Sequence, residues 1–120
     1  MEDDRRSAKR IEVNLPTTWE GLLERHEATI TSLSLNGCFM LTGGSVQPGE
    51  LVRLEIHLPE GDPVKVWGEV VDQAFEIGFA ARFKSPSEDE DQKRLIEFIR
   101  VACAVSEVLE EMRAADETEE

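Results

Sequence analysis

The stretch Val52-Arg53-Leu54-Glu55-Ile56-His57-Leu58 alternates between apolar and polar side chains. Successive side chains of a β-strand point to opposite faces, so this alternation predicts a strand with one buried face. Similar short apolar or alternating segments occur at five other places, which are residues 11–15, 28–30, 38–42, 64–70 and 77–83. The sequence therefore predicts six short strands.

Turn residues separate these strands. Gly, Pro and Ser are concentrated in residues 43–49, and Pro and Gly recur in residues 59–63. Six strands joined by such turns favour an antiparallel barrel over an open sheet, because closure removes exposed strand edges. Gly68 and Gly78 lie inside strand patterns, where they fit tight bends of a small barrel. We expect a mainly β fold, with the barrel over residues 11–86.

The apolar period changes to that of a helix in the last third of the chain, and we expect a C-terminal helix over residues 87–113. One stripe is expected to pack on the barrel and consists of Leu95, Ile99, Ala102 and Leu109. A second stripe has alternating spacings of three and four residues and consists of Phe98, Val101, Val105, Val108 and Met112. It suggests a homodimer through the helix, although burial of both stripes within one chain remains an alternative.

Composition limits the classes of function. The 120 residues carry a formal charge of −13 and are 40% hydrophobic, which indicates one small domain. The excess of acids argues against nucleic-acid or anionic-membrane binding, since those partners require contiguous positive potential. No apolar run is long enough to insert into a membrane, and the opening residues do not resemble a secretory signal. We expect a cytoplasmic protein, with an acidic disordered tail over residues 114–120.

Few residues suggest catalysis or metal binding. Cys38 and Cys103 are far apart in apolar segments, so free thiols are expected and a zinc site is not. His26 and His57 fit surface positions, and neither a phosphate-binding loop nor a dinucleotide fingerprint is present. We therefore expect neither an enzyme nor a metal site.

Two short segments suggest a ligand site. Residues 5–10 read Arg-Arg-Ser-Ala-Lys-Arg, and residues 32–37 read Ser-Leu-Ser-Leu-Asn-Gly. The arginine fork donates two parallel hydrogen bonds to phosphate or to the O6 and N7 atoms of guanine. A bend of Ser and Gly lets a ligand approach the backbone closely. Residues 1–10 are expected to form a mobile segment that closes over an anionic guanine nucleotide.

The two segments together resemble the signature of PilZ domains. Arg6-x-x-x-Arg10 is followed, after a strand, by a motif that ends in Ser34-x-x-Gly37, and residues 3–103 follow the family layout. The resemblance implies a six-stranded PilZ-like barrel with a trailing helix, and it implies cyclic di-GMP as the ligand. It places Arg6 and Arg10 on the guanines and phosphates, and Ser34 and Gly37 in the pocket. Arg5 corresponds to a residue that accompanies binding of two stacked ligand molecules.

Ser32 departs from the family pattern, which has Asp or Asn at that position. A neutral hydroxyl replaces a charged acceptor, and this costs on the order of 1 kcal/mol per site. Binding is then several-fold to about tenfold weaker. Ser32 is still included in the predicted ligand set.

The resemblance implies an adaptor that changes conformation on binding cyclic di-GMP and signals to a protein partner, as yet unidentified. The processes served would be bacterial motility, biofilm or exopolysaccharide production, or virulence. An alternative is a degenerate PilZ-like interaction module that binds no nucleotide.

Overall fold

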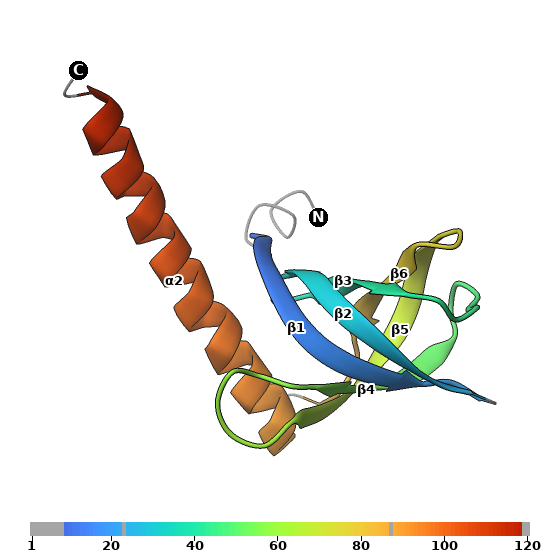
Figure 1. Ribbon diagram of the computed structural model, residues 1–120. Helices are drawn as coiled ribbons and strands as arrows, with labels where there is room; N and C mark the ends of the chain where they lie inside the picture. Colours follow the sequence, from blue (N-terminus) through green and yellow to red (C-terminus); the bar gives the residue numbers. More distant parts are fainter. Residues whose placement is uncertain (1–8, 23, 87, 119–120) are drawn as a thin grey trace.

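The computed structural model describes residues 9–22, 24–86 and 88–118. Six strands form one closed barrel in which every neighbouring pair is antiparallel, with the order β1-β2-β3-β6-β5-β4. One long helix follows the barrel (Figure 1). The elements are β1 (Ile11–Glu20), β2 (Arg25–Leu33), β3 (Gly37–Thr42), β4 (Leu51–Ile56), β5 (Val64–Ala74), β6 (Gly78–Phe83) and α2 (Glu90–Thr118). The predicted six-stranded antiparallel barrel with a C-terminal helix is confirmed.

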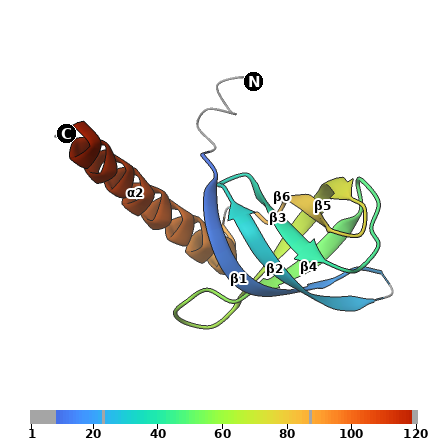
Figure 2. The same cartoon turned by 45° about the horizontal axis from the view of Figure 1, so that its top comes forward.

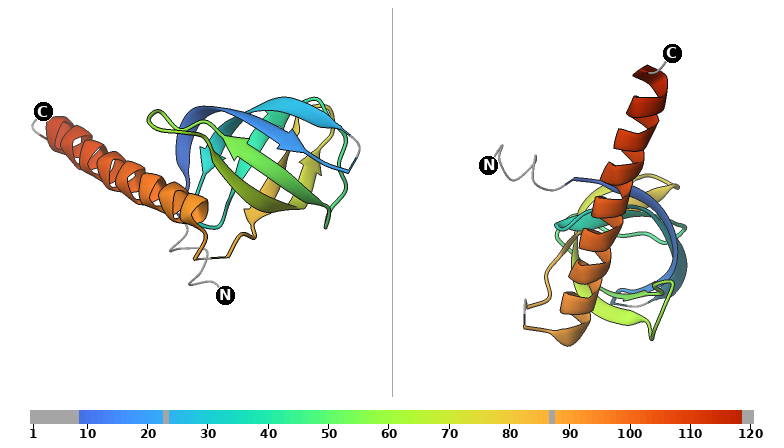
Figure 3. Two further views of the ribbon diagram at one scale, coloured as in Figure 1. Left: turned by 90° about the horizontal axis from the view of Figure 1, so that it is seen from below. Right: turned by 90° about the vertical axis from the view of Figure 1, so that its left-hand side faces the viewer.

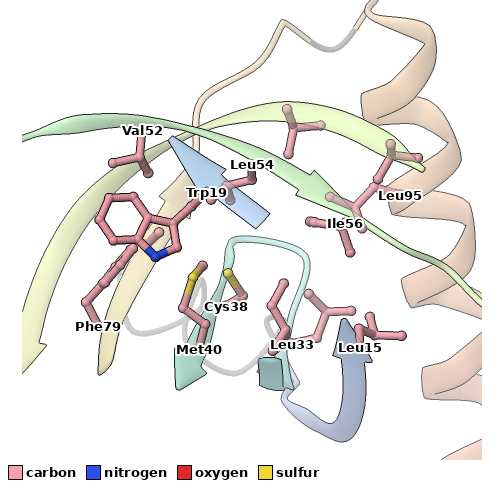
Figure 4. Close-up of a cluster of buried hydrophobic side chains, with 14 of the residues drawn as sticks. Leu15, Trp19, Leu33, Cys38, Met40, Val52, Leu54, Ile56, Phe79 and Leu95 are labelled. Carbon is pink, nitrogen blue, oxygen red and sulfur yellow. The ribbon is translucent and has the colours of Figure 1, made fainter. Parts of the chain in front are cut away.

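Alternate side chains of the strands fill the barrel. On β4, Val52, Leu54 and Ile56 are fully buried, as the period of two predicts. Trp19 and Phe79 come from opposite parts of the barrel and meet edge to face, with ring centroids 5.2 Å apart (Figure 4). The indole N–H of Trp19 donates to the Thr42 hydroxyl at 2.8 Å, so this buried polar group is satisfied.

The start of α2 is fixed to the barrel. The Asp89 carboxylate accepts from the backbone N–H groups of Asp91 and Gln92 at 2.8 and 3.3 Å, which makes Asp89 the N-cap. The Asp91 carboxylate accepts from the N–H of Lys65 on β5 at 2.8 Å. The acidic residues of the first turn, Glu90 and Asp91, also interact favourably with the positive end of the helix dipole. These contacts hold the first turns of α2 against β5.

The second half of α2 extends away from the barrel (Figures 2 and 3). Leu95 and Ile99 are fully buried, as expected, whereas Leu109 is 51% exposed, so the prediction that Leu109 packs on the barrel is wrong. The alternative in which both stripes are buried is also wrong, because four residues of the second stripe are exposed, namely Val101, Val105, Val108 and Met112. A helix of 29 residues is about 43 Å long and outruns the barrel beside it.

The end of the helix also differs from the sequence expectation. Residues 114–118 continue α2 to Thr118, where we expected an acidic disordered tail from residue 114. Most of these residue types form helix readily, so an existing helix propagates through them at little cost.

The two cysteines are free and differ in their surroundings. Cys38 is buried inside the barrel, while Cys103 on α2 is partly buried. Burial raises the pKa of the Cys38 thiol from 9.0 to about 12, and the nearby Arg10 guanidinium opposes this increase only in part. Cys38 is therefore an unreactive thiol at neutral pH.

We predict that a thiol reagent at pH 8 labels Cys103 in the native protein and labels Cys38 only after unfolding. Because the folded pKa of Cys38 exceeds its ordinary value of 9.0, stability should fall as the pH rises from about 9 towards 12. Mass spectrometry after timed labelling tests the first point. A Cys103→Ser variant that reacts as fast as the wild type under native conditions would contradict it.

Candidate ligand-binding site

The side chain of Arg10 contacts the strand that leads into the serine-glycine bend. Its guanidinium Nη1 donates to the Ser32 hydroxyl at 2.9 Å. Arg10 directly precedes β1, whose residue Ile11 pairs with Leu33 on β2, so antiparallel pairing brings the two segments together. Arg5 and Arg6 lie outside the described residues. One of the three predicted arginines is thus placed beside the predicted bend.

The bend between β2 and β3 is held by Ser34. The Ser34 hydroxyl accepts from the N–H groups of Asn36 and Gly37 at 3.2 and 3.3 Å. The backbone N–H of Ser34 donates to the Gly37 carbonyl at 2.8 Å. Ser34 is buried, so its side chain shapes the bend from inside and offers little surface of its own.

Gly37 permits a close approach of β3 and β6. A Cβ atom at this position would lie 2.1 Å from the carbonyl oxygen of Ala81, a distance that atoms do not tolerate. The N–H of Phe83 on β6 also donates to the Asn36 carbonyl at 2.9 Å. The bend is thereby anchored to β6 as well as to its own hairpin.

One further exposed side chain, that of Arg82, lies beside the bend, and sequence reasoning did not include it among the site residues. Arg82 pairs across β3 and β6 with Gly37, which has no side chain to cover it. Trp67 is also exposed, but it lies on β5, which β6 separates from the bend, and the guanidinium of Arg53 on β4 lies 5.4 Å from its ring centroid. The alternation along β6 predicts that the Arg82 side chain points outward. Its proximity to Gly37, however, depends on the pairing of β3 with β6, which the sequence does not specify.

Lys9 connects the basic segment to α2. Its ammonium lies 3.5 Å from a Glu110 carboxylate oxygen and 3.9 Å from one of Glu107. Both glutamates belong to the part of α2 that extends beyond the barrel. The neighbouring residues Lys9 and Arg10 therefore contact different parts of the molecule, the helix and the end of β2.

The described parts of the chain contain neither a cluster of metal-ligating side chains nor a helix that could span a membrane. Within residues 9–22, 24–86 and 88–118, no cluster of His, Cys, Asp and Glu is arranged to hold a metal ion. Over the same ranges, α2 is too polar to span a bilayer.

A closed six-stranded barrel that presents an arginine beside a serine-glycine bend, with a helix after the last strand, defines a class of small barrel domain. A family model described as "PilZ domain" matches residues 4–100. The chain belongs to the PilZ domain family. No curated protein matches this sequence.

A solved structure supports the fold. The Bacillus subtilis inhibitor of motility MotI/DgrA is similar, with a TM-score of 0.65 and 22% sequence identity. The similarity covers 83% of this chain and 51% of that one, so this chain spans about half the length of MotI/DgrA. At this identity the likeness concerns the barrel architecture alone.

We predict that Gly37→Ala destabilises the protein by about 1–3 kcal/mol, because the added methyl group forces β3 and β6 apart. Gly43→Ala is the matched control, since a Cβ there meets nothing within 4 Å. Urea denaturation of both variants measures the difference. Equal stabilities would show that the close approach at Gly37 is relieved without cost.

Proposed function

We propose that this chain is a cyclic di-GMP-binding adaptor of the PilZ family. The observation that carries the proposal is the contact between Arg10 and Ser32 at the edge of the serine-glycine bend. It joins the two sequence motifs that, in this family, supply the ligand site. The ligand is a dianion with two guanines, and the arginine fork matches both phosphate and guanine edges.

Arg10 is suited to exchange its present partner for the ligand. It donates to a neutral hydroxyl in an exposed setting, a hydrogen bond with a net value of about 0.5–1.5 kcal/mol. A phosphate oxygen would provide a charge-assisted bond of about 1.5–3 kcal/mol. Arg10 therefore gains by turning towards the ligand, and Arg5 and Arg6 are proposed to join it.

Ser34 and Gly37 are proposed to act mainly through the shape of the bend. The Ser34 hydroxyl already serves two backbone N–H groups, and Gly37 allows the bend to lie against β6. Ser32 and the exposed Asn36 are then the bend side chains best placed to meet a ligand directly.

The ion pairs between Lys9 and α2 suggest how ligand binding changes the conformation of the protein. Exposed ion pairs such as those of Lys9 with Glu107 and Glu110 contribute at most about 1 kcal/mol each. Several charge-assisted contacts between residues 5–10 and the ligand exceed this, so binding displaces Lys9 from the helix. The released acidic face of α2, together with the ligand and the residues that cover it, would form the surface that a protein partner binds.

We further propose that the chain is a receptor and not an enzyme, and that it acts in the cytoplasm, where second messengers act. By analogy with the family, its partner would serve motility, biofilm or exopolysaccharide production, or virulence. The exposed stripe on α2 is a separate surface, for which self-association is argued below.

We predict that calorimetry detects micromolar binding of cyclic di-GMP, and that Arg10→Ala weakens it at least about tenfold because one bidentate contact is lost. Arg6→Ala should have a similar effect. Arg25→Ala is the matched control, since Arg25 begins β2 at the end remote from Ser32. No heat with the wild type at millimolar ligand would overturn the proposal and leave the interaction module that binds no nucleotide.

We further predict that Ser32→Asp tightens binding several-fold. The carboxylate would accept from the guanine N–H edge and hold Arg10 in place with a charge-assisted bond. Titration of this variant beside Ser32→Ala separates the added charge from the lost hydroxyl. An unchanged or weaker constant for Ser32→Asp would show that position 32 does not meet the base.

A further inference from the structure

An apolar stripe lies along the exposed part of α2. It consists of Val101, Val105, Val108 and Met112, which are 53%, 52%, 53% and 60% exposed, and we call it the valine stripe. Its spacings of four, three and four residues align these side chains on one side of the helix. These exposures show that the described residues of this chain leave the stripe uncovered, and the second half of α2, to which Val105, Val108 and Met112 belong, extends away from the barrel (Figure 3).

An apolar groove continues the stripe at its N-terminal end. The loop between β4 and β5 lies beside the first turns of α2 (Figure 1), and the groove between them has a volume of about 660 Å³. Leu58, Pro59 and Phe98 line it, and we call it the Leu58 groove. Lys93 and Glu97 are among the charged residues at its rim. Phe98 lies one helical turn before Val101, so the groove and the stripe form one surface.

The charge of α2 is distributed unevenly along its length. Its first part contains as many cations as anions, namely Lys93, Arg94 and Arg100 with Glu90, Asp91 and Glu97. The part after Ser106 is strongly acidic, with Glu107, Glu110, Glu111, Asp116 and Glu117 against Arg113. Two such helices packed in parallel would bring both acidic ends together. Antiparallel packing places each acidic end beside the cations of the other helix.

We propose that two copies of this chain pack antiparallel through the valine stripe. A twofold axis near Val105 makes the contact self-complementary. It places Met112 of each copy at the level of Phe98 in the other copy, where the flexible thioether fills the Leu58 groove. The same alignment sets Arg100 level with Glu110 of the second copy. This inference does not depend on nucleotide binding.

A second copy fits this surface better than other occupants. A helix with the same spacing of apolar residues matches the stripe along its whole length, and this chain provides such a helix. An anionic bilayer would be repelled by the acidic residues that flank the stripe. Each chain contributes one Leu58 groove, and in the dimer each groove is filled by Met112 of the other copy. No groove is then left for a third chain, so the association stops at two chains.

Sedimentation velocity of the full chain, with and without cyclic di-GMP, tests the assembly. We expect a dimer in both conditions. Val105→Glu with Val108→Glu should raise the dimer dissociation constant at least about a hundredfold, since two charges would enter an apolar contact. Val71→Glu, at a β5 valine that is 45% exposed, is the matched control and should remain dimeric. A monomeric wild type, or a dimer unaffected by the paired substitution, would overturn the proposal.

Disulfide trapping in a Cys103→Ser background tests the orientation, since Cys38 is too buried to interfere. Val105→Cys should form a covalent dimer on mild oxidation, because the two sulfurs lie near the axis. Met112→Cys should not, because seven residues on each side of the axis separate the two positions by about 21 Å. Rapid crosslinking of Met112→Cys would indicate parallel helices and overturn the antiparallel arrangement.

Discussion

Closure of the sheet between β1 and β4 is the constraint on which the rest of the structure depends. Residues Thr17 to Glu20 of β1 pair with Arg53 to Ile56 of β4, so the first strand has neighbours on both sides. Closure leaves no exposed edge among the six strands and encloses the apolar face of each. At the other end of β1, the antiparallel pairing with β2 places Arg10, the residue before β1, beside the end of β2.

The position of Arg10 matters because the molecule is acidic overall. The chain has a formal charge of −13, so an exposed arginine beside a polar bend is a local positive site on an acidic surface. The carboxylates of α2 neutralise Lys9, while Arg10 donates to a hydroxyl that carries no charge. For the proposed dianionic ligand, Arg10 would be a local partner despite the unfavourable net charge, because screening confines surface interactions to about 10 Å or less at ordinary ionic strength.

Most errors of sequence reasoning arose where a residue's surroundings depend on the size of the barrel. Leu109 has the same helical phase as Leu95, yet only Leu95 is buried, because the barrel ends before the helix does. Arg82 was missed for a related reason. Its outward direction follows from the alternation of β6, but its position beside Gly37 follows from the pairing of two strands far apart in sequence.

The sequence by itself determined the strands, the helix and the two motifs, because alternation, helical period and turn residues are local properties of the chain. It also determined that Gly37 and Ser34 belong together, since three residues separate them. Only the tertiary structure decided that Arg10 meets Ser32, that Lys9 meets α2, and that the described residues leave the valine stripe exposed. Those relations depend on the pairing of β1 with β2, on the position of α2 beside the barrel and on the length of the helix relative to the barrel, and all three involve residues far apart in the sequence.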